Sequence, residues 1–288
     1  MRILEPTEIR ERILTLRKDG FPKGINPGWS NLNDYYRICK RQLTIVTGIP
    51  SHGKSEFVDA LMINLAESRK WRFLIYSPEN YPFEVHWRKQ AEKLMGKKFF
   101  GGDATDWDIE QAINTISTNF YFLDSEEEDL TMQQIFTVAS KIKSLDGVLI
   151  DPWNELEGHR AIHESETDYI GRCLKNARKW ARYHNMLVII VAHPTKATPE
   201  NGIYPVPDAY KIHGSSHWYN KADNILCVYR NATETEIHIQ KVKFKYYGQR
   251  GMVKMFYNMD SGRYEEIDFD QQNQQDFTNT LARTGERL

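Results

Sequence analysis

Residues 48–55, Gly-Ile-Pro-Ser-His-Gly-Lys-Ser, match the pattern GxxxxGK[ST] of the phosphate-binding P-loop. Glycines let backbone N–H groups wrap around phosphate oxygens, the lysine reaches the β and γ oxygens, and the last hydroxyl takes a Mg²⁺ position. The stretch therefore predicts a site for ATP, or another nucleoside triphosphate, together with Mg²⁺. The residues expected to contact the nucleotide are Gly48, Ser51, His52, Gly53, Lys54 and Ser55, and Ser55 is also a candidate metal ligand.

The residues on either side of this stretch have the pattern that a P-loop requires. Residues 42–47, Gln-Leu-Thr-Ile-Val-Thr, predict a short buried strand, and apolar residues recur at helical spacing over residues 56–69. A strand, a loop and a helix in this order are the structural setting of a P-loop. The flanking pattern therefore favours a true nucleotide site over a coincidental match.

The composition is that of an ordinary globular chain, with 288 residues, 40% of them hydrophobic and 27% charged. This length allows one large α/β domain or two small ones. There is no apolar run of about 18 residues and no apolar signal-peptide core, so we expect a cytoplasmic protein. The cysteines, Cys39, Cys173 and Cys227, are far apart and predict reduced thiols rather than a metal site or disulfides.

The formal net charge of −1 argues against a broad basic surface. A nucleic-acid contact would have to be local, or be made by a surface pooled from several subunits. One local candidate is the loop of residues 195–214, which is rich in proline, glycine and lysine and too long for a simple connector. Lys196, Lys211 and His213 make this loop cationic, and Arg160 lies in the irregular stretch of residues 153–165.

Polar residues follow three further apolar runs, each of which predicts a buried strand. These runs are residues 72–77, 147–151 and 187–192. Ligands bind at the carboxyl edge of parallel sheets, so Glu79 can polarise an attacking water and Asp151 can bind Mg²⁺ as a Walker B acid. His193 can sense the γ-phosphate. The alternatives are a capping or solvated carboxylate at Glu79 and a structural histidine at His193.

The remaining pattern predicts helices alternating with strands and an antiparallel end to the sheet. Helices are expected over residues 83–95, 131–143 and 168–184, strands over residues 120–123 and 223–230, and a hairpin over residues 236–257 that turns near Gly248. Residues 97–108 are interpreted as a loop. The fold class is α/β, with a RecA-like P-loop NTPase core whose mostly parallel sheet is flanked by helices and ends in C-terminal antiparallel strands.

An amphipathic helix is expected near the N-terminus, over about residues 7–18. Its apolar stripe either packs on its own domain or docks on a neighbouring subunit. Residues 21–33 form a turn-rich connector. The glutamine-rich residues at the C-terminus are expected to form a loose tail.

The ordered motifs resemble the helicase domain of the DnaB family, most closely its phage primase-helicase and Twinkle branch, over roughly residues 24–268. The features that carry the resemblance are the P-loop, Ser-Pro-Glu79, Leu-Ile-Asp151, Val-Ala-His193-Pro194-x-Lys196, Gly214-Ser215-Ser216 before Ala222-Asp223-Asn224, and Lys243-Phe244-Lys245-Tyr246-Tyr247-Gly248. Their order and spacing together are specific, although each motif after the P-loop is weak alone.

The resemblance implies a role for each matched residue in ATP hydrolysis. Glu79 matches the carboxylate that activates water, Asp151 the Walker B acid, and His193 the sensor, for which other members carry Gln. Arg230 and Tyr257 match positions that flank the nucleotide base.

Two lysines match the pair that reaches across a subunit interface to the neighbour's γ-phosphate. They are Lys243 and Lys245, and the family has Arg at the position of Lys245. Lysine is a point charge without the two-pronged geometry of arginine, so its stabilisation of the transition state is expected to be weaker, or shared with Arg250.

The resemblance also implies a ring around DNA. The stretch after Asp151 and the loop from Lys196 to Gly214 match the two loops that line the pore, so six copies of Arg160, Lys196 and Lys211 would form a cationic channel for single-stranded DNA. The N-terminal helix resembles the linker that docks on the adjacent subunit.

The sequence therefore predicts an ATP-dependent, ring-shaped replicative DNA helicase, hexameric if it follows the family, with single-stranded DNA and a primase or helicase loader as partners. It divides into a linker at residues 1–23, an ATPase domain at 24–268 and a polar tail at 269–288. Its place of action would be the cytoplasm or nucleoid of a phage host. The alternatives are a RecA-like recombinase or recombination mediator, which would form filaments, and an accessory ATPase indifferent to DNA.

Overall fold

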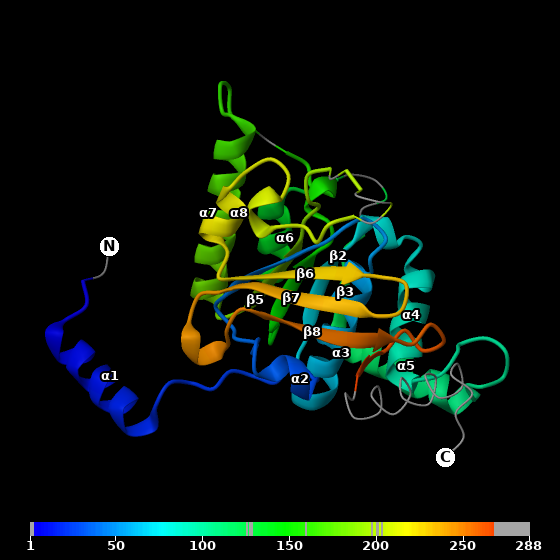
Figure 1. The fold of residues 1–288 in the computed structure, drawn as a ribbon. Helices are drawn as coiled ribbons and strands as arrows, with labels where there is room; N and C mark the ends of the chain where they lie inside the picture. The colour runs from blue at the N-terminus through cyan, green and yellow to red at the C-terminus, as the bar shows by residue number, and fades with distance from the viewer. Residues whose placement is uncertain are drawn as a thin grey trace, which may run out of the picture.

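A single mixed sheet runs through the centre of the fold (Figure 1). The structure is a computed structural model that describes residues 3–124, 126, 129–158, 160–196, 198–199, 202 and 204–267. Within these residues the strand order is β3-β2-β4-β5-β1-β6-β7-β8-β9. The strands are β1 (Leu43–Thr47), β2 (Phe73–Tyr76), β3 (Phe120–Phe122), β4 (Gly147–Ile150), β5 (Leu187–Val191), β6 (Asn224–Arg230), β7 (Thr235–Val242), β8 (Gly251–Tyr257) and β9 (Tyr264–Glu266).

The first six strands in this order, β3 through β6, pair in parallel with their neighbours. Strands β7, β8 and β9 then continue the sheet in antiparallel fashion. Strand β1 lies between β5 and β6, with Thr44 opposite both Ile189 and Asn224. Because parallel strands end at the same edge of a sheet, the segments after β1, β2, β4 and β5 converge there. The predicted fold class is confirmed.

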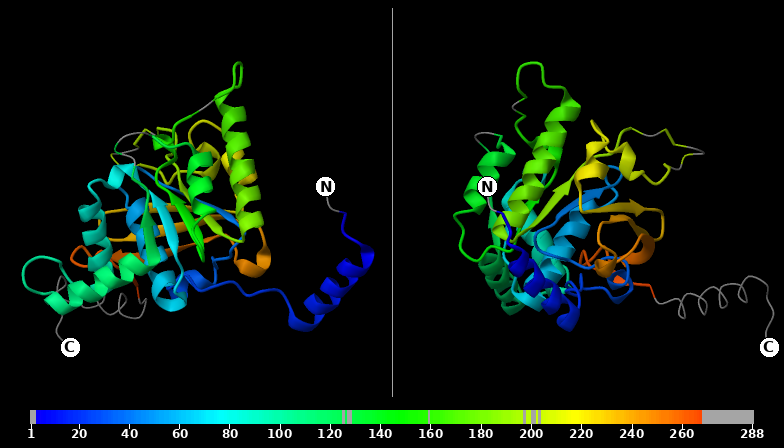
Figure 2. Two further views of the ribbon diagram at one scale, coloured as in Figure 1. Left: turned by 180° about the vertical axis from the view of Figure 1, so that it is seen from behind. Right: turned by 90° about the vertical axis from the view of Figure 1, so that its left-hand side faces the viewer.

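Helices cover both faces of the sheet (Figure 2). They are α1 (Pro6–Asp19), α2 (Ser30–Asn33), α3 (Lys54–Arg69), α4 (Phe83–Met95), α5 (Asp106–Asn119), α6 (Met132–Ala139), α7 (Glu166–His184) and α8 (His217–Lys221). One core contains the apolar sides of α3, α4 and α5, and a second core contains those of α6, α7 and α8. Successive residues of β1 alternate between the two, since Ile45 faces the second core and Val46 the first.

Helix α5 is the main element that the pattern did not predict. It begins inside the stretch interpreted as a loop, at Thr105, whose side chain accepts a hydrogen bond from the Asp108 N–H while Asp108 caps Thr105 in return. Helix α6 is shorter than predicted and ends at Ala139, because the next hydrogen bonds are of the tighter i→i−3 type, from the Lys141 N–H to the Val138 carbonyl at 2.9 Å and from the Ile142 N–H to the Ala139 carbonyl at 3.3 Å. The predicted hairpin is confirmed, with a 3₁₀ turn η4 (Lys245–Tyr247) before Gly248.

Helix α1 extends away from the sheet and its two cores (Figure 1). None of its residues is buried, and Ile13 is 57% exposed. The structure therefore contradicts packing of α1 on its own domain and leaves its apolar stripe in contact with solvent. The C-terminal tail that the sequence predicted lies outside the described residues. Among the helices that are described, none is long and apolar enough to cross a membrane.

Candidate functional site

The P-loop connects β1 to α3 at the carboxyl edge of the sheet, as predicted. Gly48 has φ +147°, and a Cβ there would lie 2.1 Å from the Val228 carbonyl oxygen, so only glycine lets the loop pass this close to β6. The Lys54 ammonium is buried and donates to the Ile49 carbonyl at 3.1 Å. Burial lowers the pKa of Lys54, and the nearby carboxylates of Asp151 and Glu79 oppose this change.

Two side chains with oxygen atoms suited to Mg²⁺ lie close together at the end of the P-loop. Asp151, at the end of β4, is 3% exposed, and Ser55 is the second residue of α3. Burial raises the pKa of Asp151 to about 6, against the opposing hydrogen bond from the Ser55 hydroxyl. No group of three His, Cys, Asp or Glu side chains in the described residues forms a complete metal site. This donor set fits Mg²⁺, which keeps several waters and shares phosphate oxygens with one or two protein ligands.

Glu79 and His193 follow two different strands and lie close together at the carboxyl edge of the sheet. Glu79 lies in the 3₁₀ turn η1 (Pro78–Asn80) after β2, and its Oε1 is 4.0 Å from Nε2 of His193, which follows β5. Burial, with Lys54 nearby, lowers the pKa of His193, which favours the neutral imidazole. Its Nδ1 is buried without a hydrogen-bond partner in the described part of the chain. The structure thus brings Lys54, Ser55, Glu79, Asp151 and His193 together.

The predicted base-flanking residues also lie beside the P-loop. The Arg230 guanidinium lies 4.2 Å from the centre of the Tyr257 ring. His52 accepts a hydrogen bond from the Arg230 N–H at 3.0 Å, and a Cβ on Gly53 would lie 2.9 Å from Arg230 Nη2. Arg230, Tyr257 and the P-loop therefore form one continuous wall.

Two residues of this wall were missed by sequence reasoning. Glu56 accepts a hydrogen bond from the Tyr257 hydroxyl at 3.1 Å and pairs with Lys89 and Lys93 of α4. Tyr264 of β9 donates to the Gly53 carbonyl at 3.1 Å. Glu56 directly follows the P-loop, which was the available signal, whereas no local pattern marks Tyr264.

Lys243 and Lys245 lie at the opposite edge of the sheet from their own P-loop. Val242, the last residue of β7, pairs with Asn224, which in turn lies opposite Thr44 near the start of β1. The segment that carries both lysines, orange in Figure 1, therefore follows the amino edge of the parallel strands. Lys243 pairs with Asp223 at 3.1 Å, and Lys245 is exposed.

The two candidate DNA loops lie side by side at the carboxyl edge. Within the second loop, an isolated bridge joins Pro194 to Ile212 and the Thr195 N–H donates to the Lys211 carbonyl, so the two ends of this loop, with Lys196 and Lys211, lie close together. The two loops border a shared cavity of about 190 Å³, to which the loop after Asp151 contributes Trp153 and the other loop contributes His213. Arg160 is exposed, and His213 lies 3.8 Å from Glu166.

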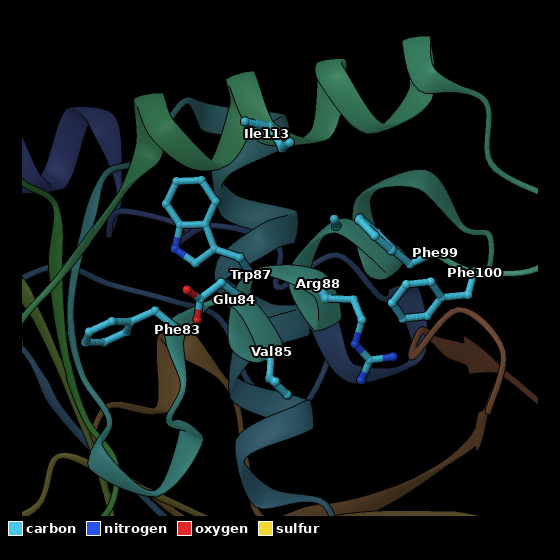
Figure 3. A pocket seen from close by; sticks show the side chains of 9 residues that line it. Phe83, Glu84, Val85, Trp87, Arg88, Phe99, Phe100 and Ile113 are labelled. Carbon is cyan, nitrogen blue, oxygen red and sulfur yellow. The ribbon is translucent and has the colours of Figure 1, made fainter.

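A larger apolar groove, of about 530 Å³, lies away from the nucleotide site between α4, α5 and the loop that joins them (Figure 3). Trp87 of α4 and Ile113 of α5 contribute to it from facing helices, and Phe100 of the loop, 68% exposed, closes one end. Val85 is also partly exposed along the groove.

The fold and the P-loop edge together define a RecA-like P-loop ATPase. The family described as DnaB-like helicase C terminal domain matches residues 24–266. The chain belongs to this family.

One relative is the Twinkle homolog protein, chloroplastic/mitochondrial, of Arabidopsis thaliana. It is 33% identical over 270 residues, which cover 87% of this chain and 37% of the relative, so the chain spans little more than a third of that protein. Among solved structures, one described as an ATPase domain has a TM-score of 0.76 at 20% identity, covering 90% of this chain and 99% of that one.

Two further structures share the fold. A DnaB-like replicative helicase, described with its interactions with primase, has a TM-score of 0.74 at 19% identity, covering 93% of this chain and 68% of that one. The RadB recombinase has a TM-score of 0.58 at 12% identity, covering 85% and 100%. The fold is therefore common to helicases and a recombinase, and it does not by itself separate the two.

Proposed function

We propose that the protein is an ATP-dependent replicative DNA helicase that forms a ring and translocates on single-stranded DNA. The ring is a hexamer, as the resemblance to the DnaB family implies. The observation that carries the proposal is the position of Lys243 and Lys245, which lie across the sheet from their own P-loop. A single copy cannot place them at its γ-phosphate, whereas a neighbouring copy in a ring can. Membership of the DnaB-like family supports the same assignment.

Each residue at the P-loop edge has a role in this proposal. Lys54 binds the β and γ oxygens, and Ser55 and Asp151 hold Mg²⁺, which neutralises phosphate charge when bound. Glu79 orients and deprotonates the attacking water. His193 donates a hydrogen bond to the γ-phosphate as the neutral imidazole that its lowered pKa favours.

The neighbouring subunit supplies the cation that completes the site. Lys245 is exposed and is the better candidate for reaching the γ-phosphate, since Lys243 is held by Asp223 at 3.1 Å. Arg250, exposed after the same 3₁₀ turn, can share this role. A positive charge supplied in trans stabilises the charge that develops on the transferred phosphoryl group.

Ring closure gives α1 the partner that its own domain does not supply. Its stripe of Ile9, Ile13 and Leu16 is apolar, like the groove between α4 and α5. Figures 1 and 2 show α1 and the pair α4 and α5 on opposite sides of one copy. The occupant of the groove is therefore α1 of a second copy. This arrangement repeats around a ring because it is head-to-tail.

The pore would be lined by Arg160, Lys196, Lys211 and His213, which lie on the two loops at the carboxyl edge. Six copies of these cations give a channel that attracts the phosphate backbone although the whole chain is nearly neutral. A primase or helicase loader is a further partner in this proposal, with the linker at 1–23, the ATPase domain at 24–268 and the tail at 269–288. The place of action is the cytoplasm or nucleoid of a phage host, although the name of the Arabidopsis relative assigns that protein to organelles.

The direct test is unwinding of a forked DNA duplex with ATP and Mg²⁺, beside the Lys54→Ala variant. The proposal expects strand separation by the wild-type protein and none by the variant. Strand exchange on open filaments, without unwinding, would instead identify a recombinase of the kind that RadB represents. Turnover indifferent to DNA would identify an accessory ATPase.

A further inference from the structure

A buried polar cluster ties the P-loop helix to the helix that follows Glu79. Asp59 of α3 is 2% exposed, His86 of α4 is 1% exposed, and Gln90 of α4 is fully buried. Nε2 of His86 lies 2.9 and 3.1 Å from the two carboxylate oxygens of Asp59, and Nε2 of Gln90 lies 3.4 Å from one of them. Since a carboxylate only accepts, His86 donates this hydrogen bond.

Burial of the Asp59–His86 pair has a free-energy cost. A buried carboxylate is costly unless a donor satisfies it, and an apolar pair of similar size is often no less stable. The charged groups around His86 are Asp59 of α3, Asp151 beyond β4 and Lys89 of α4. Burial alone would lower the pKa of His86, but the charge and hydrogen bond of Asp59 outweigh it, and the net change is upward.

The positions of the two residues connect the catalytic elements. Asp59 is one helical turn after Ser55, so both lie on the same side of α3. His86 is in the first turn of α4, and its N–H donates to the Pro82 carbonyl at 3.4 Å, just after the turn that carries Glu79. Glu79 itself is 53% exposed, and its turn is closed by hydrogen bonds from Asn80 to Ser77.

We propose that Asp59 and His86 are positioning residues for ATP hydrolysis: their buried hydrogen bond fixes the start of α4 against the P-loop helix, and thereby holds the Glu79 turn over the γ-phosphate. The inference rests on the proposed function, since it assigns a task to Glu79. Neither residue touches the nucleotide. Their effect is on the rate of the chemical step and on the mobility of the turn, and not on nucleotide affinity.

The test compares His86→Leu, which removes the donor, with His86→Gln, which restores one. We expect His86→Leu to lower kcat by about tenfold or more while the Kd for a fluorescent ATP analogue with Mg²⁺ changes less than about twofold. Hydrogen exchange at the amides of residues 77–81 should become faster, and His86→Gln should recover most of both effects. If His86→Leu does not fold, Asp59→Asn, which removes the negative charge and one of the two acceptor oxygens that face His86, is measured in its place, with smaller changes expected in the same directions.

The control is Asp146→Asn, which changes an acid that is 16% exposed and pairs with Lys40 at the opposite edge of the sheet. We expect this variant to lose stability and keep the wild-type kcat per folded molecule. Two outcomes for the folded His86 and Asp59 variants would overturn the inference. One is a normal kcat with unchanged hydrogen exchange at residues 77–81, and the other is a normal kcat with faster exchange throughout the protein. If the wild-type protein hydrolyses no ATP, the proposed function fails, and the exchange measurement still decides whether the cluster holds the turn.

Discussion

The residues that we propose to act on ATP differ in how firmly the fold holds them. Lys54 and Asp151 are buried, so packing fixes their positions before nucleotide binds. Glu79 is about half exposed and lies on a 3₁₀ turn. Preorganised groups suit binding, whereas a group on a turn can adjust as the γ-phosphate arrives. We therefore expect substitutions at these positions to separate binding from catalysis.

The first prediction concerns Glu79. Glu79→Gln keeps the shape of the side chain but removes its ability to take a proton, so kcat should fall by about 10²- to 10⁴-fold while ATP binding persists. Steady-state turnover and a binding titration measure the two effects. The control is Glu67→Gln, an exposed carboxylate near the end of α3. Near-normal turnover in Glu79→Gln would remove Glu79 from the mechanism.

The second prediction concerns Glu56 and acid pH. Burial would raise the pKa of Glu56, but Lys93 and Lys89 overcome this and lower it from 4.5 to about 2. A lowered carboxyl pKa adds stability that is fully present above pH 4.5 and is lost as the pH falls towards 2. Glu56→Gln should therefore lower the free energy of unfolding at neutral pH by at most about 3 kcal/mol, and this difference should shrink below pH 4.5.

Urea unfolding of both proteins at a series of pH values measures this difference. A difference that stays constant down to about pH 3 would show that the ion pairs of Glu56 do not supply it. The same variant should also leave the Tyr257 hydroxyl without its carboxylate partner, which weakens ATP binding through the wall formed with Arg230.

At the residue scale, the sequence predicted which candidate site residues lie at the strand ends. Glu79, Asp151 and His193 each follow an apolar run, and parallel strands bring such positions to one edge whatever the remaining contacts are. The contacts of Tyr264 with Gly53 and of Glu56 with Tyr257 join residues more than 200 positions apart. No local pattern encodes such approaches, so they required the tertiary structure.

At the element scale, the apolar surfaces of α1 and of the α4–α5 groove are each without a partner among the described residues of one copy. Helix α1 buries none of its residues, and the groove exposes Val85 and Phe100. An isolated helix of this length is marginally stable in water, so α1 needs packing to persist. The amphipathic pattern predicted the helix, but only its position in space excluded packing on its own domain.

The third prediction tests this pairing from both sides. Ile13→Glu on α1 and Ile113→Glu in the groove should each place a charge in the contact and lower the fraction of large assemblies. Thr15→Glu, on the other side of α1, is the matched control and should assemble normally. Sedimentation at several protein concentrations measures the effect. Unchanged assembly of both isoleucine variants would show that α1 does not occupy the groove.

Helix α5 shows why an element can be missed although its signal is present. Thr105 and Asp108 form a reciprocal cap, the signature of a helix start, but the glycines just before them indicate a loop. The helix is held by apolar contacts of Ala112 and Ile116 with the core that also contains α3 and α4. Tertiary packing thus decided between two local signals that conflict.

At the scale of the whole molecule, the proposed ring places Lys245 at the neighbouring subunit's site, so hydrolysis would be a property of neighbouring subunits. The fourth prediction follows from this. When inactive Lys245→Ala subunits are mixed into wild-type rings, they should reduce turnover at the intact sites of their neighbours, so activity falls more steeply than the wild-type fraction. Lys175→Ala, an exposed lysine on α7, is the control. Strictly proportional activity would argue against sites shared between subunits.

The measurement that tests the shared-site ring most directly is ATP turnover against protein concentration, with and without single-stranded DNA. We predict a cooperative onset as subunits assemble, and strong stimulation by DNA because the proposed pore loops and His193 lie at the same edge of the sheet. Flat specific activity that DNA does not change would contradict both the shared sites and the DNA channel.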